Sequence, residues 1–346
     1  MFRLLLLMLL CFVWPGQALI VINGKEEPVL DRTVNDGMAL LYKDEFSAAI
    51  KVFSEVRAKY PYHPIGYFLI AAALDAKMVF YYSGFLEADF MKNCEKAIEK
   101  GEEQLQKLPN DKWLLFFVGG AYGYMGTFQA RYKNYISAFR NGWTGVSLLK
   151  QINANNPDFV DPLFGLGTYH YWSSRLSKAL WWMPGLKDER VTGITQLERC
   201  LNRGEFTRVP AAGNLMRIFI EEKRFADAIR LAEQQLKIYQ NNRIFLYNLA
   251  EAYYLSNDLN EAEKYFVQVV DLCDSEEFNN NVGSLKCHSY LAKIYEVKKL
   301  YVKALAECRR GKQYKFNETD KLLAQEFLDD INGTQNRILK IYHPSR

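Results

Sequence analysis

Apolar residues recur every three or four positions through most of the chain from about residue 31 onward, with polar residues between them. This spacing is the period of an amphipathic α-helix, so the pattern predicts consecutive helices rather than strands. Pro61, Pro109 and Pro157 each end a helical run, and Asp111 and Asp158 are suitable caps for the helices that follow. The chain is therefore predicted to be all-α, with short turns between its helices.

A set of small and large apolar residues repeats along the C-terminal half of the chain. Small residues at these positions allow two antiparallel helices to approach closely, and the large residues fill the space between hairpins. One copy lies in segment 242–273, and a shift of 34 residues gives another: Leu249, Ala250, Tyr253, Ala262 and Phe266, then Leu215, Phe219, Ala228 and Ala232. This pattern resembles the tetratricopeptide repeat, and the resemblance implies a right-handed α-α solenoid of stacked helical hairpins.

The middle of the chain repeats at a longer interval. An interval of 48 residues separates several pairs of identical residues: Pro61 and Pro109, Pro109 and Pro157, Gly119 and Gly167, Gly145 and Gly193, Leu149 and Leu197. The central hairpins are therefore predicted to be enlarged to a 48-residue repeat. Seven extra residues on each helix are about two turns, which would keep the buried stripe in phase. A single inserted loop or short helix is the alternative.

We expect about seven hairpins followed by a capping helix, with no linker between them. Residues 31–317 are assigned to the solenoid, and residues 318–346 to a capping helix and tail. The segment 318–331 has the polar outer face that the end of a solenoid requires, and this cap leads us to expect a monomer. The predicted hairpins are 31–61, 64–109, 112–157, 160–205, 210–240, 243–274 and 285–316.

The first 18 residues have the composition of a secretory signal peptide. Arg3 is their single charge, a short apolar run follows, and Gly16 and Ala18 occupy the positions that a signal peptidase reads. The run is shorter than the roughly 20 residues of a membrane-spanning helix. We therefore expect cleavage after Ala18, an N-terminal segment at 19–30, and an exported protein that does not span a membrane. It would be periplasmic in a Gram-negative bacterium and secreted otherwise. An uncleaved anchor is the alternative.

Charge and cysteine content argue against several classes of function. The 44 Lys and Arg residues against 40 Asp and Glu residues give a net charge of only +4, spread along the chain, so nothing indicates nucleic-acid binding. The five cysteines that follow the signal segment are odd in number, and no His or Cys spacing indicates a metal or cofactor site. Cys273 and Cys287 could meet in a disulfide, and otherwise all five are expected to be buried thiols.

Aromatic residues are concentrated in the enlarged repeats. Between residues 111 and 182 there are 17 aromatics, including every tryptophan that follows the signal segment. The same region holds a spaced set of residues: Gly165-x-Gly167-x-Tyr169, Ser174, Pro184-Gly185, Asp188-x-Arg190-x-x-Gly193 and Leu197. This set is similar to the signature of the tetratricopeptide repeat protein 39 family and its bacterial relatives. The resemblance implies a helical repeat protein with no catalytic residue to carry over.

Several residues of this set have local structural interpretations. Gly165 and Gly167 are expected to let a neighbouring helix approach, because a residue without a side chain leaves room for it. Asp188 and Arg190 are expected to cap a helix and to hold the enlarged hairpin together. No strand precedes the glycines, so a phosphate-binding loop is not indicated.

The leading hypothesis for function is a non-enzymatic, exported scaffold that binds a protein or peptide. In a tetratricopeptide solenoid, the first helix of each hairpin lines the concave groove. The positions that usually line this groove can be mapped onto the present sequence. This groove is predicted to be aromatic in its middle and of mixed charge toward the C-terminus, where Glu221, Lys286 and Glu296 also take groove positions. The candidate binding residues are Trp113, Phe116, Tyr124, Phe164, Tyr171, Trp172, Arg217, Tyr247, Glu251, Tyr254 and Lys293.

Three alternatives remain open at the level of sequence. The central rings could bind a glycan or a lipid, because flat aromatic faces lose water at a small entropic cost. The same rings could instead be buried against one another in the core. An enzyme centred on His170 is the third alternative, although neither a metal-binding His pair nor a nucleophile elbow accompanies this residue.

Overall fold

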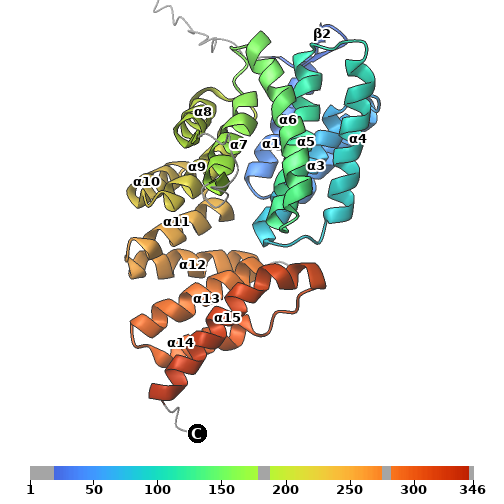
Figure 1. Cartoon of the computed structure of the whole chain (residues 1–346). Helices are drawn as coiled ribbons and strands as arrows, with labels where there is room; N and C mark the ends of the chain where they lie inside the picture. Colours follow the sequence, from blue (N-terminus) through green and yellow to red (C-terminus); the bar gives the residue numbers. More distant parts are fainter. Residues whose placement is uncertain (1–18, 178–187, 275–281, 343–346) are drawn as a thin grey trace, which may run out of the picture.

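Helices form nearly all of the molecule. The computed structural model describes residues 19–177, 188–274 and 282–342, so the predicted signal segment lies outside the described residues, as do Trp181 and Trp182. Helices α1–α14 follow one another as seven packed pairs, and α15 ends the described chain (Figure 1). The predicted all-α solenoid is thereby confirmed.

The first helix begins at Pro28, inside the segment assigned to residues 19–30, and the last described helix extends to Ile341. The helices are α1 (Pro28–Tyr42), α2 (Phe46–Lys59), α3 (Ile65–Tyr81), α4 (Glu87–Leu105), α5 (Lys112–Arg131), α6 (Tyr135–Asn155), α7 (Pro162–Ser177), α8 (Arg190–Arg203), α9 (Arg208–Glu221), α10 (Phe225–Leu236), α11 (Arg243–Leu255), α12 (Leu259–Asp274), α13 (Val282–Val297), α14 (Tyr301–Gly311) and α15 (Glu318–Ile341).

A small hairpin that the sequence analysis did not predict precedes the solenoid. Strands β1 (Val21–Ile22) and β2 (Lys25–Glu26) pair antiparallel across a tight turn. Asn23 and Gly24 both have positive φ there, as this type of hairpin turn requires. The neighbouring Ile20 is fully buried, so the segment is anchored to the core of the first hairpin.

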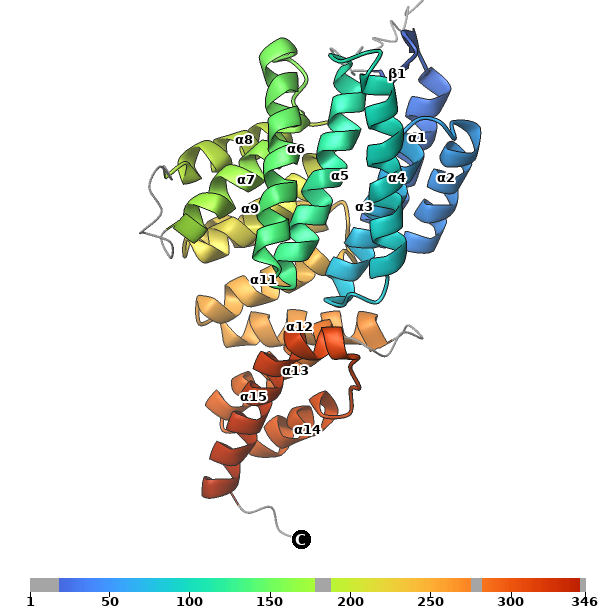
Figure 2. The same cartoon turned by 45° about the vertical axis from the view of Figure 1, so that its right-hand side comes forward.

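The extra length of the third hairpin lies in both of its helices. Helix α5 has 20 residues and α6 has 21, whereas α11 and α12 have 13 and 16. Asp111 caps α5 as expected, because its side chain accepts hydrogen bonds from two backbone N–H groups of the first turn. Figures 1 and 2 show the result, a block of long, nearly parallel helices α3–α6 beside the shorter helices α7–α12.

Pairs of glycines hold the two helices of the third and fourth hairpins unusually close together. A Cβ atom on Gly145 would lie 2.6 Å from the carbonyl oxygen of Gly119 on the facing helix. The same relation recurs 48 residues later, where a Cβ on Gly193 would lie 2.6 Å from the carbonyl oxygen of Gly167. The repeat that relates these glycines in the sequence is therefore a repeat of backbone-to-backbone contact between helices.

The solenoid turns back on itself, so that its first hairpin contacts its sixth. The carboxylate of Asp44, in the turn after α1, accepts a hydrogen bond of 3.1 Å from the backbone N–H of Arg243 at the start of α11. The guanidinium of Arg243 lies 3.8 Å from the ring centroid of Phe80 on α3. Tyr42 completes this contact by donating a hydrogen bond of 2.7 Å to the carbonyl oxygen of Phe206.

A second long-range contact joins the C-terminal helix to the second hairpin. Asp320, in the first turn of α15, is fully buried. Its carboxylate accepts hydrogen bonds from the Ser83 hydroxyl at 2.5 Å and from the backbone N–H of Gly84 at 2.8 Å. The Tyr132 hydroxyl donates a third, longer bond of 3.4 Å. The carboxylate thus satisfies donors that would otherwise be buried without an acceptor.

The described part of the chain contains no helix that is both long enough and apolar enough to cross a membrane. All five cysteines that follow the signal segment are buried thiols, including Cys273 and Cys287. Burial raises the pKa of Cys94, which keeps this thiol protonated.

We predict that Gly145→Ala destabilises the protein by about 1–3 kcal/mol, because the added methyl group would overlap the facing backbone. Gly142 lies on the same helix and is the matched control, since a Cβ at this position meets nothing within 4 Å. Gly142→Ala should leave stability unchanged or raise it by up to about 1 kcal/mol, because alanine favours helix more than glycine does. Urea unfolding followed by circular dichroism measures both changes, and equal midpoints for the two variants would contradict the close contact.

Asp320→Ala is expected to destabilise the protein by about 2–4 kcal/mol, because the buried hydroxyl and N–H donors lose a charged acceptor. The same substitution at Asp329, an exposed residue of the same helix, should have little effect. Limited proteolysis should also cleave α15 earlier in Asp320→Ala than in Asp329→Ala. Identical protection of the helix in both variants would show that the contact contributes nothing.

Candidate functional site

The aromatic residues predicted for the third hairpin lie in the core. The Trp113 side chain is 1% exposed, and its ring centroid lies 4.9 Å from that of Phe159 and 5.8 Å from that of Phe206. Phe116 is also buried, and its ring packs against those of Trp113 and Phe159. Tyr124 is partly exposed, but its ring lies against Phe68 of α3. Of the two interpretations left open by the sequence, burial therefore holds for Trp113 and Phe116.

The aromatic residues predicted for the fourth hairpin also have internal partners. Tyr171 is fully buried and donates a hydrogen bond of 2.8 Å to Glu222. Burial and this carboxylate both raise the pKa of the Tyr171 phenol. The half-buried Trp172 donates its indole N–H to Asn214 at 3.3 Å, and Phe164 is half-buried as well. These rings stabilise the repeat and do not form an open cluster for a glycan or lipid.

The remaining predicted residues converge on one surface formed by the first helices of successive hairpins. Arg175 of α7 pairs with Glu221 of α9 at 2.6 Å, and Glu221 pairs with Arg217 at 2.5 Å. Arg217 then pairs with Glu251 of α11 at 2.7 Å. Glu251 also accepts a hydrogen bond of 3.0 Å from Tyr290 of α13. We call this continuous row of groups, from Arg175 to Tyr290, the inner-face ladder.

Two further ion pairs continue the same row onto the C-terminal helix. Lys293 of α13 pairs with Asp330 of α15 at 2.5 Å, and Glu296 of α13 pairs with Arg337 of α15 at 2.7 Å. Tyr254 of α11 packs edge-on against Tyr290, with ring centroids 4.8 Å apart. Each of these contacts joins the first helices of two neighbouring hairpins, or joins α13 to the capping helix α15. Charged groups therefore extend across the whole C-terminal half of the surface.

Sequence analysis found only one side of most of these pairs. It identified Arg217, Glu221, Glu251 and Lys293 from the usual groove positions but missed Arg175 and Asp330. A signal was nevertheless present, because the members of each pair between helices are separated by about one repeat. The separations are 46 residues for Arg175 and Glu221, 34 for Arg217 and Glu251, and 37 for Lys293 and Asp330.

The centre of the ladder is electrostatically coupled. Burial alone would lower the pKa of Arg217, but Glu251 and Glu221 outweigh burial and raise it. Lys286 lies deeper, with its ammonium 4.2 Å from the ring centroid of Tyr247 and 5.6 Å from that of Phe327. Burial lowers the pKa of Lys286, and the nearby Glu251 opposes this shift. Cations at this site are thus stabilised by carboxylates and aromatic faces together.

Arg190 belongs to the set of residues that resembles the tetratricopeptide repeat protein 39 signature, and it contacts the end of α9. Its guanidinium binds Asp188 at 2.8 Å and Glu222 at 3.0 Å, so its long-range contact joins the fourth hairpin to the fifth rather than the two helices of the fourth. The backbone N–H of Arg190 also donates to Asp188 at 3.2 Å, although Glu189, and not Asp188, occupies the N-cap position of α8. Glu222 accepts bonds from both Tyr171 and Arg190, which joins α7, α8 and α9 at one carboxylate.

His170 is buried, and its environment is that of a structural histidine. Its Nδ1 atom lies 2.8 Å from the amide oxygen of Gln196, and its Nε2 atom lies 3.9 Å from Glu189. No nucleophile with a matching base is seen beside it among the described residues. In the same part of the chain, no group of three or more His, Cys, Asp or Glu side chains is arranged to hold a metal ion.

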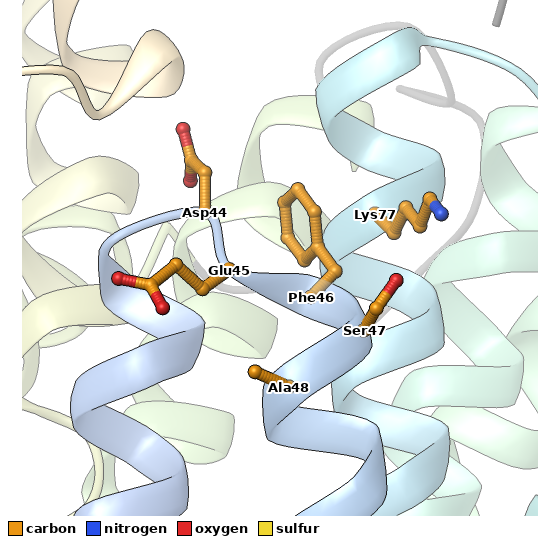
Figure 3. A pocket seen from close by; sticks show the side chains of 6 residues that line it. All are labelled: Asp44, Glu45, Phe46, Ser47, Ala48 and Lys77. Carbon is orange, nitrogen blue, oxygen red and sulfur yellow. The ribbon is translucent and has the colours of Figure 1, made fainter. Parts of the chain in front are cut away.

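One hollow of about 350 Å³ lies away from the ladder, at the start of α2. Asp44, Glu45 and Phe46 line it together with Lys77 of α3. Figure 3 shows that the Lys77 ammonium and the two carboxylates point in different directions rather than toward a common centre. Asp44 is moreover engaged by the start of α11. The hollow therefore lacks the convergent polar groups of a binding site.

Comparison with known proteins identifies the repeat. The tetratricopeptide-repeat family model matches residues 219–271, which include α10 and α11 and most of α12. No curated protein matches the sequence. The chain therefore contains tetratricopeptide repeats, whereas its narrower resemblance to the tetratricopeptide repeat protein 39 family stays a prediction.

Several solved structures are similar to this chain at low sequence identity. The C-terminal part of a tetratricopeptide repeat-containing protein from Cytophaga hutchinsonii is 16% identical with a TM-score of 0.41, covering 86% of this chain and 99% of that one. PilW, a type IV pilus biogenesis factor, is 14% identical with a TM-score of 0.44, covering 67% and 91%. Yeast Tom70 is 15% identical with a TM-score of 0.43, covering 92% and 67%.

Arg217→Gln should destabilise the protein by about 1–2 kcal/mol, because the largely buried carboxylate of Glu251 loses the guanidinium with which it forms an ion pair. Arg230→Gln is the matched control, since Arg230 forms an exposed pair with Asp227 within α10. That change should cost no more than about 1 kcal/mol. Thermal unfolding of the two variants, side by side, measures the difference. Equal losses would mean that the ladder is no stronger than an ordinary surface pair.

Proposed function

We propose that the protein is a non-enzymatic scaffold that binds a segment of a partner protein across the inner-face ladder. The observation that carries this proposal is a row of charged groups that stays partly exposed while joining four neighbouring helices. The exposed fraction of the side chain is 40% for Arg175 and 38% for Arg217. A surface of this kind can exchange its internal ion pairs for pairs with a partner.

The chemistry of the ladder favours a partner segment that carries both signs of charge. Cations and carboxylates alternate along it, so a segment with a single sign of charge would meet repulsion at every second group. Tyr254 and Tyr290 lie beside the row and offer half-buried aromatic area next to the charged groups. Aromatic area supplies affinity in such interfaces, and the charges supply selectivity and register.

The tetratricopeptide match supports the same region. Residues 219–271 include Glu221 and Glu251 as well as Tyr254, so the family assignment and the ladder overlap. The proposal also includes export. The composition of residues 1–18 is that of a signal peptide, which would place the scaffold in the periplasm of a Gram-negative bacterium or outside the cell. We further propose that the protein acts as a monomer.

A photo-reactive amino acid at position 254 should capture a defined protein partner in the native cell fraction. The same amino acid at position 238, an exposed site at the end of α10, is the control for random encounters. Mass spectrometry identifies the captured protein. A capture pattern that is the same at both positions would contradict binding at the ladder.

The affinity for that captured partner should fall about tenfold when Arg175 and Lys293 are both changed to Gln, because each cation loses a contact across the interface. Arg230→Gln, an equivalent loss of charge on α10, should leave affinity unchanged. Isothermal titration calorimetry with the purified partner measures both. Unchanged affinity in the double variant, with helicity intact by circular dichroism, would remove the ladder from the binding surface.

A further inference from the structure

Helix α6 presents a stripe of large apolar side chains to solvent. Tyr135, Phe139 and Trp143 are spaced by four residues, so they follow one another along one face of the helix, and Ile136 lies beside them. Their exposed fractions are 57%, 57%, 54% and 88% respectively. The rings of Phe139 and Trp143 stack with centroids 6.4 Å apart. Single exposed apolar residues are common on proteins, but four adjacent ones on a helix indicate an interaction surface.

Helix α6 and the two helices packed against it carry charge of one sign. Helices α5, α6 and α7 contain no Asp or Glu residue. Lys133, Arg140 and Lys150 are exposed on α6 or in the turn before it. No carboxylate of the described residues forms an ion pair with any of the three. The outer face of α4, by contrast, mixes both signs in pairs such as Lys96 with Glu99.

We propose that the outer face of α6 docks on an anionic lipid surface. Tyrosine and tryptophan are the side chains that favour the boundary between hydrocarbon and water, and Ile136 and Phe139 supply the apolar insertion. Arg140 and Lys150 lie on the same exposed face and meet the negative headgroups. The absence of carboxylates on α6 and on the two helices that pack against it removes the repulsion that such a surface would otherwise exert.

The stripe and the inner-face ladder lie on different layers of the solenoid. Helix α6 is the second helix of its hairpin, whereas the ladder is built on first helices. Docking through α6 therefore leaves the ladder accessible. The inference stands on the exposure and charge of α6 alone, and it holds or fails independently of partner binding at the ladder.

Co-sedimentation of the purified full chain with lipid vesicles tests the proposal. The native protein should bind vesicles of phosphatidylglycerol mixed with phosphatidylcholine, and bind pure phosphatidylcholine vesicles about tenfold more weakly. The triple variant I136S/F139S/W143S should lose at least about tenfold in affinity for the anionic vesicles, because its apolar insertion is gone. R140Q/K150Q should also bind about tenfold more weakly and show a smaller dependence on salt.

The matched control is V191S/I238S/V302S. It removes the same number of exposed apolar side chains, but from three different helices or their ends. This variant should bind anionic vesicles as the native protein does. Circular dichroism checks that all variants keep the native helix content, which is expected because every substituted side chain is exposed.

Tryptophan fluorescence gives a second measurement that does not depend on the triple variant. Anionic vesicles containing brominated lipid should quench the emission of the native protein, and the conservative change Trp143→Phe should abolish that quenching. The proposal is overturned if the native protein does not bind anionic vesicles, or if the triple variant binds them as well as the native protein does. Vesicle-independent cross-linking of a protein to position 136, without vesicle binding, would equally overturn it and assign the stripe to a protein partner.

Discussion

A buried carboxylate at the start of the last helix closes the whole molecule. Asp320 accepts hydrogen bonds from a turn that lies 237 residues earlier in the chain, and it is fully shielded from water. In an ordinary solenoid, each repeat contacts only its neighbours. Here Asp320 at one point and Asp44 at another join distant hairpins, so early hairpins contact later parts of the chain directly.

This closure determines which parts of the inner surface can act. Trp113 and Phe116 face the return of the chain and meet Phe159, so the aromatic half of the predicted groove becomes core. The charged half remains partly exposed, as the 40% and 38% exposed fractions of the Arg175 and Arg217 side chains show. The division between structural and functional residues therefore follows from the path of the superhelix more than from residue type.

The features that depend on local or periodic interactions were predicted correctly from the sequence. The 48-residue spacing of Gly119 and Gly167 marked a backbone contact between helices, and Asp111 marked the start of a helix correctly. The burial of side chains between distant hairpins was not predicted, because it depends on the pitch of the superhelix and the spacing of residues within one repeat does not determine that pitch. The burial of Trp113 requires Phe206, which lies in a different hairpin, and no spacing within one repeat indicates that meeting. The sequence showed that the α6 region is rich in aromatic residues. Only the structure shows that Trp143 is exposed whereas neighbouring aromatic rings are buried.

The closing contact also sets the order in which the chain can complete its fold. Ser83 and Gly84 find their acceptor only after the residues up to Asp320 have left the ribosome, because the acceptor lies on the last helix. Until then, the ends of the second and third hairpins expose polar groups and apolar rings that the finished protein hides. A protein built from local hairpins thus acquires contacts of high sequence separation, which slow folding and link the ends of the chain into one cooperative unit.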